Sequence, residues 1–342
     1  MRVRGGLQIG ALIAALLVPS SAAQAGAAQP TAVAPAPGKP APGTPAPGTP
    51  AAVAPAPGTP AADKPAPRTS AAAPVPRWET LPLPPALPAP VTTGRVAVGK
   101  AQIYVATYGA ADAPGGPVVL LHGGMGSGAQ FGAQLPALLP RHHVIVIDSR
   151  GHGRSTLGTG ALGYHTMAGD VVAVLDQLGV GAAAMVGWSD GGIVALDLAI
   201  TAPTRVTRFA VIGTSYDASG NKRRPARTPA TFRAYGRACR AQHAALGGTA
   251  RAYDAMLAAM RPVWRSPGGY TPAQLRGITA PALVTIGAHD EIISVDHVRR
   301  MATLIPGATL RIFEDTSHFA MWQDPAMVNA ALVAFLAPTS SE

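Results

Sequence analysis

Cysteine and charged residues are scarce in this chain, and both shortages narrow what it can be. Cys239 is the only cysteine among 342 residues, which excludes an intramolecular disulfide, a cysteine-rich zinc site and an iron–sulfur cluster. Charged residues make up 13% of the chain and aromatic residues 5%. Proline is abundant but uneven: 20 of the 35 prolines fall between Pro30 and Pro90. This clustering excludes a single globular body that runs from end to end.

The N-terminal segment is typical of a secretory signal. Two arginines within the first four residues precede an apolar run at 7–18, and Ala23-Gln24-Ala25 offers a cleavage site. The run is shorter than the roughly 20 residues that a membrane span needs. We predict a signal peptide at residues 1–25, with an uncleaved anchor as the alternative. The mature protein is then exported, periplasmic or secreted, without a transmembrane segment.

Residues 26–77 repeat alanine, proline, glycine and threonine, and the string AVAPAPG occurs at 32–38 and again at 52–58. Proline removes backbone donors and bulky apolar side chains are almost absent, so no core can form. We predict a disordered linker, either a tether or passive low-complexity sequence. A domain at 78–342 follows, long enough to bury a substantial core.

Within this domain, short apolar runs alternate with helical patterns. A hairpin is expected at 96–107, and buried strands at 118–121, 144–147, 184–186, 210–212, 283–286 and 310–313. Helices are expected at 167–178, 191–199, 295–304 and 327–336. The alternation predicts an α/β fold with a mostly parallel sheet and flanking helices. In such sheets, sites gather at the carboxyl ends of the strands.

Two glycine-rich turns compete to define the chemistry. The first, HGGMGSGA at 122–129, imitates a dinucleotide fingerprint, with Asp148 ending the next strand. A preceding hairpin and His122 at the start of the turn count against that interpretation. The second, Gly187-Trp188-Ser189-Asp190-Gly191, matches G-x-S-x-G between a buried strand and an apolar helix. That context predicts a sharp turn presenting Ser189 as a nucleophile.

Five motifs carry a resemblance to the α/β-hydrolase family: LLHGGMG at 120–126, DSRGHGRS at 148–155, GWSDGG at 187–192, GAHD at 287–290 and DTSHF at 315–319. They occur in that family's order, and the resemblance covers residues 95–337. It implies an α/β-hydrolase fold. The GWSDGG motif resembles the valacyclovir-hydrolase-like branch, whose members cleave small esters. Between the strands at 210–212 and 283–286, helical stretches at 231–245 and 249–260 suggest a cap at about 214–280.

The catalytic groups follow from the chemistry of a serine nucleophile. A serine needs an adjacent base, and the base needs an acid that orients it. In this fold the chain order is serine, acid, histidine, which selects Ser189, Asp290 and His318. Glu291 and Asp315 are the lesser candidates for the acid. The other histidines have structural interpretations. His289 is interpreted as a loop residue, His152 as a group that stabilises a turn, and His122 as a support for the oxyanion loop.

The oxyanion hole requires two backbone N–H groups. One is expected from Asp190, which follows the nucleophile. The resemblance assigns the other to Gly124, with Met125 as a rival. Trp188 and Asp190 are the predicted substrate contacts. The Asp190 carboxylate either pairs with a cationic group of the substrate or sits at the helix N-terminus, where a negative charge is favourable.

The predicted cap carries most of the charge. Residues 214–280 hold 11 lysines and arginines against Asp217 and Asp254, a net +9 of the chain's formal +10. This field suits anionic substrates or an anionic envelope surface; arginine-rich composition alone is the other interpretation. No nucleic-acid partner is expected, because no aromatic interleaving accompanies the charge.

The main hypothesis is a serine hydrolase that cleaves a small-molecule carboxylic ester or lactone through an acyl-enzyme. Amide and carbon–carbon bonds stay open, since the fold does not decide the substrate. No metal and no organic cofactor is required. The alternatives are a non-catalytic envelope-binding module that uses the basic cap and, less favoured, a dinucleotide-binding enzyme.

Overall fold

The computed structural model describes residues 74–222, 228–265 and 268–337. The predicted signal peptide and nearly all of the predicted linker lie outside the described residues. The compact unit begins at Pro74. Its first residues pack against the C-terminal part of the domain: Arg77 forms an ion pair with Asp324, and the Trp78 ring stacks on His289 with 3.8 Å between ring centroids.

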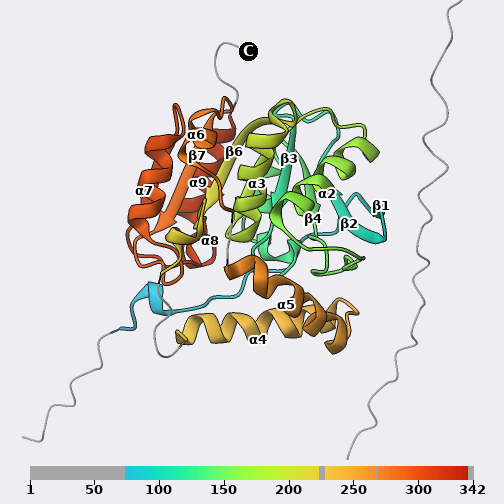
Figure 1. Ribbon diagram of the computed structural model, residues 1–342, viewed down its shortest axis with the longest axis horizontal. Coiled ribbons are helices and arrows are strands. Elements are labelled where there is room, and N and C mark those ends of the chain that lie inside the picture. The colour runs from blue at the N-terminus through green and yellow to red at the C-terminus, as the bar shows by residue number, and fades with distance from the viewer. Residues whose placement is uncertain (1–73, 223–227, 266–267, 338–342) are drawn as a thin grey trace, which may run out of the picture. The chain divides into compact units, whose positions relative to one another are not determined.

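A single eight-stranded sheet forms the centre of the described residues (Figure 1). Its strands are β1 (Thr92–Val98), β2 (Ala101–Tyr108), β3 (Pro117–Leu121), β4 (His143–Ile147), β5 (Ala183–Trp188), β6 (Val206–Ile212), β7 (Ala282–Gly287) and β8 (Thr309–Phe313). Their order is β1-β2-β4-β3-β5-β6-β7-β8. The pairs from β4 to β8 are parallel, whereas β2 runs antiparallel to both β1 and β4. The predicted α/β-hydrolase fold is confirmed.

The burial of each strand explains its composition. All six residues of β5 and of β7 are buried, as a parallel strand covered on both faces requires, and continuous runs of apolar residues satisfy this. The edge strand β1 is mostly exposed and buries only Val96. The hairpin predicted at 96–107 is present, with Val98 paired to Ala101 across the turn.

The helices fall where the apolar periodicity changes. They are α1 (Leu135–Leu138), α2 (Tyr164–Gln177), α3 (Asp190–Thr201), α4 (Ala230–Ala245), α5 (Ala250–Arg265), α6 (Pro272–Arg276), α7 (Val295–Leu304), α8 (Ala320–Gln323) and α9 (Pro325–Leu336). The part of the chain that the structure describes also contains four 3₁₀ turns, at Arg77–Glu79, Gly128–Phe131, Pro203–Arg205 and Ala218–Gly220. Among the described residues, no helix combines the length and the apolar character needed to cross a membrane.

The segment between β6 and β7 contains α4 and α5, which lie side by side below the sheet in Figure 1. We call these two the cap helices. Each is amphipathic: α4 buries Tyr235 and Cys239, and α5 buries Met256 and Met260. The apolar stripes therefore face the domain, and arginines occupy the exposed positions.

Candidate active site

Ser189 lies in a strained turn between β5 and α3. Its φ of 52° is in the left-handed region, which non-glycine residues rarely adopt. The Ser189 N–H donates to the carbonyl of Ile212, which anchors the turn to β6 at 2.9 Å. The turn leaves no room for side chains nearby: a Cβ on Gly191 would overlap the carbonyl oxygen of Leu121. The strain holds the Ser189 side chain at the carboxyl edge of the sheet.

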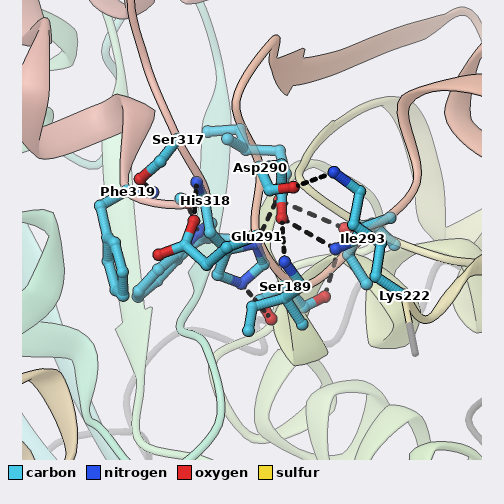
Figure 2. Close-up of polar contacts among 12 residues, drawn as sticks. Ser189, Lys222, Asp290, Glu291, Ile293, Ser317, His318 and Phe319 are labelled. Carbon is cyan, nitrogen blue, oxygen red and sulfur yellow. Dashed lines mark hydrogen bonds and ion pairs between the residues drawn. The ribbon is translucent and has the colours of Figure 1, made fainter. Parts of the chain in front are cut away.

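The structure brings Ser189, His318 and Asp290 together in one chain of hydrogen bonds (Figure 2). His318 Nε2 lies 3.0 Å from Ser189 Oγ. His318 Nδ1 lies 2.8 Å from Asp290 Oδ2. The three residues follow β5, β8 and β7, whose carboxyl ends share one edge because these strands are parallel. This is the arrangement of a nucleophile, a base and an acid that orients the base.

Asp290 is completely buried and its carboxylate is fully engaged. Oδ1 accepts the N–H groups of Ile292 and Ile293, each at 2.8 Å. Oδ2 is left for His318. The Lys222 ammonium donates to the Asp290 backbone carbonyl at 2.6 Å. The two N–H donors therefore determine which oxygen faces the imidazole.

The charges around His318 favour its protonated form. Burial by itself lowers the pKa of His318, but the charge of Asp290 and its hydrogen bond outweigh burial, and the pKa is raised above its usual 6.5. The carboxylates of Glu291 and Asp190 add to this effect. An imidazole in this environment is a stronger base toward the serine hydroxyl.

Three backbone N–H groups border the same space. Those of Gly124, Met125 and Asp190 have no acceptor among the described residues. Met125 has a φ of 69°, so this loop is strained like the serine turn. Both Gly124 and Met125 line the cavity with Ser189. The geometry leaves both candidates for the second oxyanion donor in place.

A cavity of about 340 Å³ opens at Ser189, within the range of small-molecule sites. Its apolar walls come from Met125, Ile193, Phe232 and Trp264. Its polar groups include the side chain of Lys222. The Ser189 side chain thus borders a mainly apolar cavity with a few polar groups.

The family model described as "Alpha/beta hydrolase family" matches residues 118–331. The chain belongs to this family. It is 31% identical over 281 residues to the carbamate hydrolase RutD, as that protein is described, from Variovorax paradoxus, covering 70% of this chain and 97% of that protein. The chain is therefore an α/β hydrolase.

One further relative matches over a shorter part of the chain, and one solved structure matches in its fold. RutD from Azorhizobium caulinodans is 39% identical over 127 residues, which cover 37% of this chain and 46% of that protein. The chain thus spans less than half of that relative. The solved structure of Est816, titled as an N-acyl homoserine lactone degrading enzyme, aligns with a TM-score of 0.58 and 28% identity, over 70% of this chain and 99% of the other.

Within this α/β hydrolase, the Asp190 carboxylate is not free for a substrate amine, which was one of the two alternatives left open by the sequence. Tyr164 donates its hydroxyl to Oδ1 at 3.0 Å, and Trp264 Nε1 donates to Oδ2 at 2.7 Å. Burial raises the pKa of Asp190. Asp190 is the first residue of α3, so its carboxylate lies at the helix N-terminus, where a negative charge is favourable, as the second alternative predicted. Its two oxygens also join neighbouring elements to the serine turn.

Trp188 was predicted to contact the substrate, but its side chain lies in the interior of the protein. Its residue borders the cavity, but the side chain is fully buried. The indole N–H donates to the His318 carbonyl at 2.9 Å. The ring lies against Phe319 and Trp322. Trp188 thus supports the histidine loop from beneath, because its polar atom is already satisfied there.

The glycine-rich turn after β3 is not arranged for a dinucleotide. The Asp148 carboxylate, which would hold a ribose, accepts the N–H groups of Gly128 and Arg154. His122 is buried and supports the loop: Nδ1 bonds the Gly123 carbonyl, and Nε2 accepts the N–H of Ser149. His152 bonds the carbonyl of its neighbour Arg150. These groups maintain the turns beside the site.

Glu291 and Asp315 do not reach the imidazole Nδ1, which bonds Asp290. Asp315 is exposed. Glu291 instead lines the cavity and accepts the backbone N–H of His318 at 3.1 Å. Two further residues of the site were not predicted: Thr231, which bonds Glu291, and Tyr235. Local patterns carry no signal for them, because their partners are far along the chain.

Proposed function

We propose that this hydrolase is a serine hydrolase that cleaves a small carboxylic ester or lactone through an acyl-enzyme. Ser189 Oγ attacks the carbonyl carbon while its proton passes to His318 Nε2. The protonated imidazole then gives that proton to the leaving oxygen, and the C–O bond breaks. Water, deprotonated by His318, attacks the acyl-enzyme, releases the acid and restores the serine.

The observation that carries this proposal is the chain of bonds from Asp290 through His318 to Ser189 at the wall of the cavity. Asp290 holds the imidazole in the tautomer that presents Nε2 as an acceptor. The N–H of Asp190 and that of Gly124 or Met125 stabilise the negative oxygen that develops. The lactone alternative draws further support from Est816, titled as a lactone-degrading enzyme.

The test is hydrolysis of a chain-length panel of nitrophenyl esters and of homoserine lactones by the chain and by Ser189→Ala. A fluorophosphonate probe is added to both proteins, and intact mass spectrometry records the adduct. We expect one adduct on the wild type and none on the variant. An active Ser189→Ala protein, or a wild type that takes no adduct and cleaves nothing in the panel, contradicts the proposal.

We also propose that the protein acts outside the cytosol, on the basis of the N-terminal segment described above. Cell fractionation with N-terminal sequencing of the recovered protein tests this. A mature N-terminus near residue 26 is expected, and an intact first residue in the cytosolic fraction refutes it. Docking of the basic cap on an anionic envelope surface is tested by salt-dependent sedimentation with anionic vesicles.

A further inference from the structure

The cap helices are hydrogen-bonded to three of the four loops that carry the proposed chemistry. Tyr235 on α4 donates to the Gly124 carbonyl at 2.5 Å. Trp264 on α5 donates to the Asp190 carboxylate. Thr231, in the first turn of α4, donates its hydroxyl to Glu291 Oε1 at 2.8 Å. The cap thus touches the oxyanion loop, the serine turn and the loop of the acid.

The third contact continues to the base. Glu291 Oε2 accepts the backbone N–H of His318 at 3.1 Å (Figure 2). Because Oε1 of the same carboxylate accepts from Thr231, one carboxylate links α4 to the histidine. Thr231 is buried at 9% exposure, and the next residue, Phe232, forms part of the cavity wall. A substrate that presses on this wall therefore presses on the turn that holds Glu291.

We propose that Glu291 is a positioning residue that couples the first turn of α4 to the loop of His318. The inference rests on the proposed serine hydrolase activity. When substrate fills the cavity and α4 packs against the domain, the Thr231 hydroxyl donates to the Glu291 carboxylate. That carboxylate in turn fixes the position of the His318 backbone N–H. Substrate contacts on the cap are then expressed in the turnover rate rather than in binding alone.

Several charged groups surround the imidazole. The charge of Glu291 gives its positioning role a pH signature that packing alone would not have. Asp290 bonds Nδ1, Asp190 lies across the serine turn, and the Lys222 ammonium bonds the Asp290 carbonyl. Glu291 contributes a further negative charge that raises the pKa of His318. Removing this charge moves the acid limb of the activity profile to lower pH, whereas cutting the Thr231 bond leaves the charge in place.

The experiment is a cycle of Thr231→Val, Glu291→Gln and the double variant, with Thr231→Ser as the conservative replacement. Two exposed positions supply matched controls: Thr309→Val and Glu314→Gln. Rates are measured on a nitrophenyl ester over a range of pH. The N–H signal of His318 is followed by NMR in histidine-labelled protein, and thermal unfolding reports any loss of structure.

A buried hydrogen bond to a charged group predicts a loss of about tenfold in kcat for Thr231→Val, with KM changed less than about twofold. Thr231→Ser keeps the wild-type rate. Glu291→Gln shifts the acid limb to lower pH, and the double variant is no slower than Glu291→Gln alone. Thr231→Val also moves the His318 N–H signal, whereas neither control changes rate or signal.

Independent, additive losses in the double variant overturn the coupling, as does an unchanged His318 signal in Thr231→Val. A rate for Thr231→Val equal to that of the wild type does the same. Should Thr231→Val fail to fold, Thr231→Ala removes the same hydroxyl without adding a methyl group, and its kcat and His318 N–H signal decide by the same criteria. A wild type without hydrolysis or fluorophosphonate adduct refutes the proposed function instead, and the NMR comparison remains readable in that protein.

Discussion

Replacing Asp290 by Asn tests the site most sharply, because the structure dictates how the new amide must lie. The backbone N–H groups of Ile292 and Ile293 both donate to Oδ1, so an amide at this position keeps its oxygen there. Its NH₂ then faces His318 Nδ1, where Asp290 Oδ2 now lies at 2.8 Å. A donor in that place makes Nδ1 the acceptor and puts the ring proton on Nε2.

With its proton on Nε2, the imidazole no longer accepts from Ser189 Oγ. The wrong tautomer costs about 10⁴-fold in kcat, which corresponds to about 5.4 kcal/mol of activation free energy. The fold should remain, since the two backbone bonds survive. Steady-state hydrolysis of a nitrophenyl ester measures the rate, and Asp315→Asn is the matched control, since Asp315 is an exposed carboxylate nearby. A folded Asp290→Asn protein within tenfold of the wild type would refute the assigned role.

The remaining predictions concern pH and packing. The kcat/KM profile should rise with pH through an acid limb above 6.5, because the neutral form of His318 acts as the base and its pKa is raised; a limb below 6 argues against this base. Burial lowers the pKa of His122 to about 4, so the folded state takes up fewer protons than the unfolded state between that value and 6.5. The contribution of His122 to the free energy of unfolding should fall by about 3 kcal/mol as pH drops through this window. Urea titrations of the chain and of His122→Gln measure it as the difference between their two pH dependences. Gly191→Ala should destabilise the domain by at least about 3 kcal/mol or abolish folding, because its Cβ would overlap the Leu121 carbonyl, whereas Gly181→Ala, with open space around it, should leave the melting temperature nearly unchanged.

The central strands were predictable because they are buried on both faces. Continuous apolar runs are the direct consequence of that burial, and every strand expected from them is present in the structure. The helix at 295–304 was predicted to its ends. The short helices α1, α6 and α8 were missed, since four or five residues are too few to show a periodicity.

Some side chains of the site could be predicted from the sequence and others could not. Ser189, Asp290 and His318 follow strands in an order that the chain itself displays. The roles of the adjacent residues Trp188 and Asp190 were not predicted correctly in full. Trp188 was expected to contact substrate but its side chain is buried under the histidine loop. For Asp190 the sequence left open a substrate contact or a place at the helix N-terminus. The carboxylate lies in the first turn of α3, and Tyr164 and Trp264 occupy its oxygens.

The amino-acid sequence alone determined the fold class, the strand runs and the motifs at the strand ends, because these depend on local composition and on order along the chain. The tertiary structure decided how the segment between β6 and β7 meets the catalytic loops. Thr231 and Glu291 are 60 residues apart, and Trp264 and Asp190 are 74 apart. No local pattern encodes such pairings, since they arise only when the cap helices bury their apolar stripes against the domain.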